Sequence, residues 1–331
     1  MAKADKWQIT DMCHKEIITI LCATDNSYAP YCGIMLTSLF ESNRDCCFSV
    51  YLMTDDSISE RNRRKFEKLE VKYGNSIALR TVNVSMFANF PLNADLHITL
   101  PTYFRLLAPD IIPQNVKRCI YLDCDVIVCG SVKDLWNVVL SGKAIAGVMD
   151  CESNVACNRL GYPSDIGYIN AGISVFNLDY WRENHIQEKA FRYARDQWDR
   201  LVWMDQDIIN GLLHDSMLLL PFRFNIQNRF FVRSRWIHYT ESFRNTLKEE
   251  LKKAVIIHYS GGSKPWSFRY TGGFQHASWE KIRKMSFWRN CRIKRPITKY
   301  IKRLIKQYCL RSLYRDQINN HWILVPETEH L

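Results

Sequence analysis

The sequence predicts an α/β fold: a mostly parallel twisted sheet flanked by helices, with a basic helical C-terminal tail. The sheet is predicted because short apolar β-type runs alternate with helical patterns, and because each apolar run ends in a polar loop. The tail is predicted because cations cluster beside an apolar helical stripe near the C-terminus. Ligands bind such sheets outside the carboxyl ends of the strands, so the polar loops there form the candidate site.

Strands and helices are expected to follow one another in regular order. The expected strands cover 16–22, 48–53, 77–84, 118–128 and 144–148. The expected helices cover 31–40, 57–71 and 102–108, with Ser57 or Ser59 as the N-cap of the second. Aspartates stand at several strand ends: Asp25, Asp55, Asp56, Asp123, Asp125 and Asp150.

The second half adds three further features. Small residues and an amide combine at 167–173, and an amphipathic segment opens at 203–207, where Asp205 could be an N-cap. A short strand at 255–258 ends in His258 and is followed by a loop with two glycines and Lys264. Such a loop can offer a metal ligand, backbone N–H groups and a cation to one phosphate group, although a histidine at a strand end can also be merely structural.

Length and composition indicate a sizeable globular protein. At 331 residues, with 47% hydrophobic and 13% aromatic residues, the chain can build a large core as one domain with an appendage or as two domains. We expect a main domain over 1–279 and a basic segment over 280–331. The charged N-terminus lacks an apolar signal-like region, and no apolar run is long enough to span a bilayer, so the cytoplasm is the expected location.

The twelve cysteines do not form a metal or disulfide pattern. There is no Cys-x-x-Cys pair, and Cys22, Cys32, Cys119 and Cys129 stand among apolar neighbours. They are therefore interpreted as small buried hydrophobic residues in a reducing compartment.

The net charge of +11 is concentrated near the C-terminus. Residues 281–312 hold twelve Lys or Arg and no acid, so the rest of the chain has a net charge of −1. Within this segment, apolar residues recur at helical spacing: Ile297, Tyr300, Ile301, Leu304, Ile305 and Tyr308. A basic amphipathic helix favours docking on an anionic membrane surface; packing on the main domain and nucleic-acid binding are the alternatives.

The most informative motif is Asp123-Cys124-Asp125, which directly follows an apolar run. In an extended strand, residues two apart point to the same side, so both carboxylates are expected to project together while Cys124 faces away. Two adjacent carboxylates suit a hard divalent cation, which can in turn hold a diphosphate. One Asp-x-Asp is also expected by chance in a chain of this length, and 205–207 is a second match. The Gly-rich dinucleotide and P-loop motifs are missing, and a metal-held diphosphate would fill that gap.

Residues from about 17 to 266 resemble the family 8 retaining glycosyltransferases, particularly the bacterial lipopolysaccharide glucosyl- and galactosyltransferases. Five segments carry the resemblance, in the order and spacing of the family: CATDNSYAPY, HITLPTYFRLLAP, RCIYLDCDVIVCGSVKDLW, YINAGISVFNLDYW with WMDQDIIN, and IHYSGGSKPW. Ser27 and Ser267 stand where some relatives have Asn and His, which can alter donor or acceptor detail. The resemblance implies the GT-A nucleotide-diphosphosugar transferase fold.

The resemblance also implies a role for each matching residue. Asp123, Asp125 and His258 would ligate Mn²⁺, or Mg²⁺, which bridges the diphosphate of the donor. Asp25 and Tyr28 would contact the uracil, and Gly261 and Lys264 would hold the diphosphate. The residues implied around the donor sugar are Arg105, Asp150, Asn170, Ala171, Asp205 and Gln206, with Gln206 and Asp205 as the catalytic pair.

The implied activity is transfer of glucose or galactose from a UDP-sugar to a cell-surface glycan or lipopolysaccharide-core acceptor, with retention. The basic segment resembles the membrane-associating tail of the family, which would place the enzyme on the inner face of the cytoplasmic membrane; no nucleic-acid partner is expected. Two other classes stay open: a metal-dependent hydrolase that uses Asp123, Asp125 and His258, and a basic membrane- or nucleic-acid-binding module.

Overall fold

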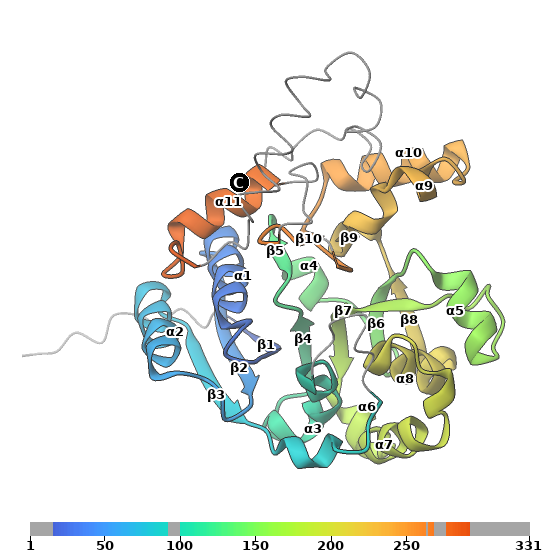
Figure 1. Cartoon of the computed structure of the whole chain (residues 1–331), viewed down its shortest axis with the longest axis horizontal. Helices are drawn as coiled ribbons and strands as arrows, with labels where there is room; N and C mark the ends of the chain where they lie inside the picture. The colour runs from blue at the N-terminus through green and yellow to red at the C-terminus, as the bar shows by residue number, and fades with distance from the viewer. Residues whose placement is uncertain (1–15, 92–99, 263, 268–275, 292–331) are drawn as a thin grey trace, which may run out of the picture.

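Two sheets form the framework of the chain in our computed structural model, which describes residues 16–91, 100–262, 264–267 and 276–291. The large sheet has seven strands in the order β3-β2-β1-β4-β7-β6-β8, and the small sheet has three in the order β5-β10-β9 (Figure 1). The strands are β1 (Ile17–Thr24), β2 (Cys47–Thr54), β3 (Ser76–Thr81), β4 (Arg118–Leu122), β5 (Val126–Val128), β6 (Ile145–Met149), β7 (Ile169–Asn177), β8 (Met217–Leu220), β9 (Ile226–Gln227) and β10 (Ile256–His258).

The large sheet is mostly parallel, as the sequence predicts. β1 pairs in parallel with both β2 and β4, β2 with β3, and β6 with β8. β7 is the exception, because it runs antiparallel to β4 and to β6. The carboxyl ends of β1, β4 and β6 consequently share one edge of the sheet, which brings the loops that follow them together.

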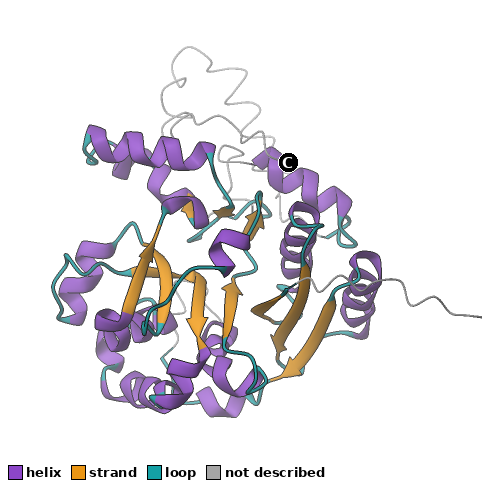
Figure 2. Ribbon diagram, turned by 180° about the vertical axis from the view of Figure 1, so that it is seen from behind, coloured by secondary structure: helices purple, strands orange, loops and turns teal. Residues whose placement is uncertain are grey.

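Helices cover both faces of the large sheet, in the three-layer arrangement seen from behind in Figure 2. Alternate side chains of β1 enter two separate cores: Ile18, Ile20 and Cys22 pack toward α1, whereas Leu21 and Ala23 pack on the other face. The helices are α1 (Ala29–Ser42), α2 (Glu60–Tyr73), α3 (Ala108–Ile111), α4 (Lys133–Trp136), α5 (Ser153–Leu160), α6 (Leu178–Glu183), α7 (Ile186–Asp196), α8 (Met204–Leu213), α9 (Arg233–Trp236), α10 (Glu241–Lys252) and α11 (His276–Met285). Short 3₁₀ segments include η1 (Val84–Phe87), η3 (Leu100–Leu107), η6 (Phe222–Phe224) and η7 (Asn228–Phe231).

Local details differ from the expectations at three places, and one pair of alternatives is decided. The predicted strand 118–128 is broken into β4 and β5, which belong to different sheets. The predicted helix 102–108 is the 3₁₀ segment η3, which leads into α3. Of the two predicted caps of α2, Ser59 is the one observed, since its side chain accepts the N–H of Asn62 at 3.4 Å. The N-cap of α8 is Trp203, so Asp205 lies inside the first turn and is not the cap.

The C-terminal side of the described chain packs on the main body. α11 contacts α1, and Trp279, Ile282 and Trp288 are buried (Figure 1). The expected boundary at 279/280 falls inside this helix, and the predicted tail helix at 297–308 lies outside the described residues. Among the described residues, no helix is both long and apolar enough to cross a bilayer. The ten described cysteines are all free thiols, and most are buried.

Candidate functional site

Asp123 and Asp125 lie in the turn that joins β4 of the large sheet to β5 of the small one. The N–H of Asp123 donates to Gly172 O at 2.8 Å, and the N–H of Tyr259 donates to Asp125 O at 3.0 Å, so each sheet fixes one of the two acids. Cys124 points away, with its thiol 3.1 Å from Ala23 O. The acids therefore converge as predicted, but a turn brings them together rather than the alternation of one strand.

His258 completes a three-residue group with these acids. It ends β10 opposite Val126 of β5, and its ligand atoms and those of Asp123 and Asp125 all lie within 4.8 Å of one another. Nε2 of His258 is 3.2 Å from Asp125 Oδ1, and Nδ1 is 3.1 Å from Asn225 Oδ1. Because the amide N–H₂ of Asn225 donates to Asn170 at 2.9 Å, its oxygen is the acceptor and assigns the proton of His258 to Nδ1. Nε2 then carries the lone pair that can bind a cation.

These three residues fit a divalent cation. Carboxylate oxygens with one imidazole suit Mn²⁺, while carboxylates alone also suit Mg²⁺. Gly172 leaves the space open, because a Cβ there would lie 2.5 Å from His258 Cε1 and 2.6 Å from Asp123 Oδ2. Although burial opposes ionisation, Lys264 and His258 hold the pKa of Asp125 well below its ordinary value, so it is a carboxylate at neutral pH. Among the described residues, no other group of acids, histidines or cysteines has this arrangement.

Arg105 joins Asp123 of the three-residue group to Asp205. The side chain comes from η3 and is buried, with Nη2 2.9 Å from Asp123 Oδ1 and Nε 2.8 Å from Asp205 Oδ2. Nη1 donates to Ala171 O at 2.5 Å, and the guanidinium lies over the ring of Tyr121 at 4.1 Å. One cation thereby holds two carboxylates from different elements in a fixed relation.

Asp205 is an unusual carboxylate because it is 3% exposed. The hydroxyl of Thr102 donates to its Oδ1, while Arg105 faces Oδ2. Burial raises the pKa of Asp205 to about 6, against the opposing effect of Arg105. A carboxyl with a pKa this close to neutrality, held beside a cation in a buried site, is typical of functional positions.

Gln206 follows Asp205 and lies against the start of β7. Its Oε1 accepts the N–H of Ala171 at 3.1 Å and the amide of Asn170 at 3.2 Å. Asn170 also donates to Asp150 Oδ2 at 2.9 Å, and Asp150 follows β6. The pairing of β6 with β7 shifts register between Gly147 and Val148, which lets these polar groups face one another at the edge of the sheet.

The loop after β10 and the loop after β1 form the remaining sides of the candidate site. Nζ of Lys264 bonds Asp125 Oδ2 and also donates to Tyr259 O at 2.8 Å. Gly261 has a φ of +78°, a left-handed conformation that favours glycine. In the other loop, Asp25 Oδ1 accepts the N–H of Tyr28 at 2.8 Å, and the half-buried ring of Tyr28 stands 6.2 Å from that of Trp266.

Comparison with known proteins identifies the family. The model for glycosyl transferase family 8 matches residues 19–269, and so covers every residue of the site described in this subsection. The chain belongs to glycosyl transferase family 8. This glycosyltransferase is 30% identical over 256 residues to general stress protein A of Bacillus subtilis, covering 76% of this chain and 88% of that protein. It is 27% identical over 267 residues to a lipopolysaccharide 1,2-glucosyltransferase of Escherichia coli, and the match covers 80% of this chain and 77% of that protein.

The solved structures agree with the family. The galactosyltransferase LgtC, in complex with donor and acceptor sugar analogs, superimposes with a TM-score of 0.73 at 25% identity, covering 82% of this glycosyltransferase and 99% of that chain. The fold is therefore the GT-A type that the sequence predicts.

The structure also assigns roles to residues of this glycosyltransferase that the sequence did not single out. Asn225 orients both His258 and Asn170, and it comes from the stretch after η6 that carries no recognisable motif. Glu152 accepts bonds from Arg229 and Arg235, and Trp203 Nε1 donates to it at 3.0 Å. By contrast, Asp55 was predicted as a strand-end acid of the site, but its carboxylate accepts the N–H of Ser57 at 3.0 Å within its own turn.

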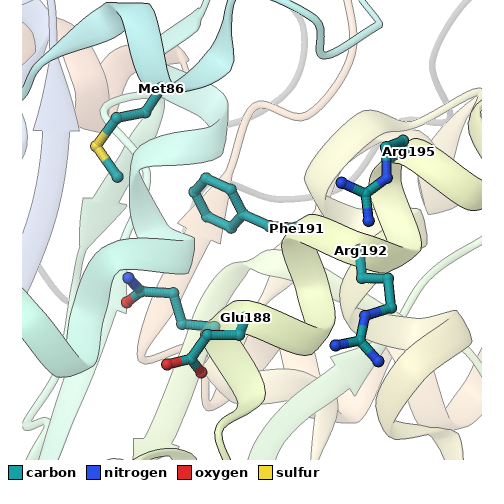
Figure 3. A pocket seen from close by; sticks show the side chains of 6 residues that line it. Met86, Glu188, Phe191, Arg192 and Arg195 are labelled. Carbon is teal, nitrogen blue, oxygen red and sulfur yellow. The ribbon is translucent and has the colours of Figure 1, made fainter.

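A separate hollow lies away from these residues. It has a volume of about 310 Å³ and lies between η1 and α7, where Phe191 points toward Met86 (Figure 3). Arg192 and Arg195 project from the same helix beside it. None of the sequence-predicted site residues lines this hollow.

Proposed function

We propose that this glycosyltransferase transfers a hexose, glucose or galactose, from a UDP-sugar to a cell-surface glycan or lipopolysaccharide-core acceptor, with retention of configuration and dependence on Mn²⁺. The observation that supports this most is that Asp123, Asp125 and His258 converge beside Lys264 and are tied through Arg105 to Asp205. In support of the proposal, groups suited to a cation lie next to polar groups suited to a sugar, at the edge of the sheet where ligands of such folds bind.

In the proposed reaction, Asp25 and Tyr28 contact the uracil, Tyr28 by stacking. Gly261 and Lys264 bind the diphosphate, and the positive charge of Lys264 stabilises the negative charge that develops there when the sugar–phosphate bond breaks. Asp123, Asp125 and His258 would hold a divalent cation, which would supply further positive charge beside the diphosphate. No strong protein acid is then needed on the leaving group.

At the sugar end, Arg105, Asp150, Asn170, Ala171 and Asp205 hold the donor hydroxyls. In this proposal, the carboxylates and the amide oxygen of Gln206 stabilise the positive charge that the anomeric carbon gains. Because a carboxamide is a poor nucleophile, we favour attack by the acceptor hydroxyl on the same face that the diphosphate leaves. In this route a diphosphate oxygen accepts the proton of the acceptor.

The location proposed for the enzyme is the inner face of the cytoplasmic membrane, docked through its basic C-terminal segment. The described start of that segment presents Lys281, Lys284 and Arg289 as solvent-accessible cations beside the buried face of α11. Cations near an anionic leaflet each contribute about 1 kcal/mol, less when salt screens them. A lipid-linked acceptor would be met at the same surface.

The direct test is slow hydrolysis of UDP-glucose and UDP-galactose, with and without Mn²⁺, followed by NMR of the product. We expect Asp123→Ala and His258→Ala to lower turnover at least a hundredfold without changing the far-UV circular dichroism spectrum. Asp199→Ala, which changes an exposed acid, should leave turnover unchanged. Full activity in excess chelator would contradict the proposed metal dependence. Release of phosphate from simple phosphate esters, without sugar transfer, would instead support a metal-dependent hydrolase.

A further inference from the structure

Trp288 fills a space on α1 that only a glycine leaves open. A Cβ at Gly33 would lie 2.1–2.4 Å from three ring atoms of Trp288, so the indole rests directly on the helix backbone. Gly33 lies near the start of α1, which begins immediately after Tyr28. The indole is 1% exposed and also packs on Phe66 of α2, with the ring centroids 4.9 Å apart. Trp288 therefore packs between the N-terminal halves of α1 and α2 and fixes the distance between them.

A chain of hydrogen bonds continues from this indole to the loop after β1. Nε1 of Trp288 donates to Asn62 Oδ1 at 3.0 Å, and Asn62 Nδ2 donates to Asn26 Oδ1 at 2.9 Å. Because an indole N–H is only a donor, it sets the orientation of the Asn62 amide and turns the N–H₂ group toward Asn26. Asn26 is held further by the N–H of Ser59, at 3.0 Å, and by the hydroxyl of Ser57, at 3.0 Å.

Asn26 stands between the two residues proposed to contact the nucleoside base, Asp25 and Tyr28. Asp25 O accepts the N–H of Ala29, and its carboxylate accepts the N–H of Tyr28, so the loop and the start of α1 form one hydrogen-bonded unit. Trp288 meets this unit twice, at Gly33 by packing and at Asn26 through Asn62. A shift of the indole is therefore transmitted to the loop after β1 both through α1 and through Asn62.

The same C-terminal helix also reaches the loop of Lys264. Trp279 of α11 lies 5.8 Å, between ring centroids, from Trp266, and Trp266 stacks on Tyr31 with centroids 3.8 Å apart. Residues 276–291 thus contact the loop of Lys264 directly, through Trp266, and the loop after β1 through Asn62.

We propose that Trp288 is a positioning residue for the nucleoside-binding loop, acting through Asn62 and Asn26. This inference rests on the proposed function, because it gives the loop of Asp25 and Tyr28 the nucleotide as its ligand. Affinity for the nucleotide then depends on a residue outside the binding site, since a loop already held in its bound conformation loses less entropy on binding. The chemical step is not affected, because Gln206 and Asp205 are held by other elements.

The sharpest probe is Asn62→Asp, which keeps the shape of the side chain and the acceptor for the indole N–H. Its second oxygen faces Asn26 Oδ1, and the two acceptors repel; if the Asn26 amide turns over, the N–H of Ser59 loses its acceptor. Trp288→Phe breaks the chain at its other end. Lys65→Met is the matched control, because Lys65 lies over the same indole, 5.4 Å from the ring centroid, without taking part in the chain.

We expect calorimetry with UDP and Mn²⁺ to show Kd five- to tenfold higher for Asn62→Asp and for Trp288→Phe than for wild type. The donor KM should rise in parallel, kcat should stay within twofold, and the double variant should be no worse than the weaker-binding single one, because both changes break one chain. Lys65→Met should match wild type. Variants with lowered Tm but unchanged Kd would overturn the inference and leave Trp288 as a packing residue. Failure of the wild type itself to bind UDP would overturn the proposed function instead.

Discussion

The ammonium of Lys264 contacts Oδ2 of Asp125, one of the three proposed metal ligands, while His258 Nε2 lies 3.2 Å from Oδ1 of the same carboxylate. Both oxygens of Asp125 are therefore engaged by basic groups of the protein. We therefore expect a divalent cation that binds Asp125 to compete with Lys264 and to release its ammonium for the diphosphate. If so, this side chain would couple metal binding to nucleotide binding.

Replacement of Lys264 is expected to have opposite effects on the two ligands. Lys264→Met removes the competing ammonium, so Mn²⁺ alone should bind more tightly, by about threefold or more. The same change should weaken binding of UDP at least tenfold, because it removes the cation proposed to hold the diphosphate. Calorimetry with Mn²⁺ alone, and then with UDP at saturating Mn²⁺, measures both effects. Lys68→Met, a change at an exposed lysine of α2, is the control, and weaker Mn²⁺ binding by Lys264→Met would refute the competition.

Gln206 is expected to act on the reacting sugar and not on the nucleotide. Gln206→Ala removes the oxygen that accepts bonds from Ala171 and Asn170, and should lower kcat at least tenfold while Kd for UDP stays within twofold. The comparison is Gln187→Ala on α7, which should change neither quantity. A large loss of UDP affinity in Gln206→Ala would show that the residue has been assigned to the wrong part of the donor.

Much of this architecture could be predicted from local sequence, for physical reasons. The strand before Asp25 and the helix after Ser59 were predicted because apolar periodicity and caps are local signals. The reversed direction of β7 was not, because direction depends on how distant segments pack. The turn at Asp123 and Asp125 was missed for the same reason. The β-type residues continue across it, so the local sequence does not indicate that β4 and β5 belong to different sheets.

The candidate site shows the same division between local and distant information. Asp123, Asp125 and His258 were predicted together because the family motifs carry them, and the structure brings them together. Asn225 carries no motif, yet it orients both His258 and Asn170. Its function arises only when β9 pairs with β10, so a single sequence offers no signal for it. The same is true of Trp288, whose partner Gly33 lies near the other end of the chain.

The raised pKa of Asp205 predicts how stability changes with pH. Its pKa is about 6 in the folded protein and about 3.8 when the chain unfolds, so the folded state holds the proton more tightly. The stability that this gives is fully present below pH 3.8 and is lost as the pH rises through about 6. Between pH 4.5 and 7.5, wild type should therefore lose on the order of 2 kcal/mol of unfolding free energy relative to Asp205→Asn, which carries no ionisable group there. Urea denaturation of both proteins at the two pH values measures this, and a difference that does not change with pH would rule out the shift.

The basic C-terminal segment is expected to dock the enzyme on an anionic membrane surface. Because Trp279, Ile282 and Trp288 are buried, a deletion that tests this must begin after residue 291 and leave α11 intact. Such a truncation should keep UDP-sugar hydrolysis within twofold of wild type and abolish co-sedimentation with vesicles that contain anionic lipid. It removes eight of the twelve cations between 281 and 312, each of which contributes about 1 kcal/mol near such a surface.

Charge reversal provides the matched full-length variant. Lys302, Arg303 and Lys306 changed together to Glu should also lose vesicle binding while the apolar residues of the segment stay the same. Raising the salt concentration should weaken wild-type binding in the same way, because screening shortens the range of the attraction. Neutral vesicles serve as the control surface for all three proteins. If the truncated and charge-reversed proteins still sediment with anionic vesicles as wild type does, then another surface of the enzyme makes the contact; if the truncation unfolds the protein, the segment is chiefly a packing element.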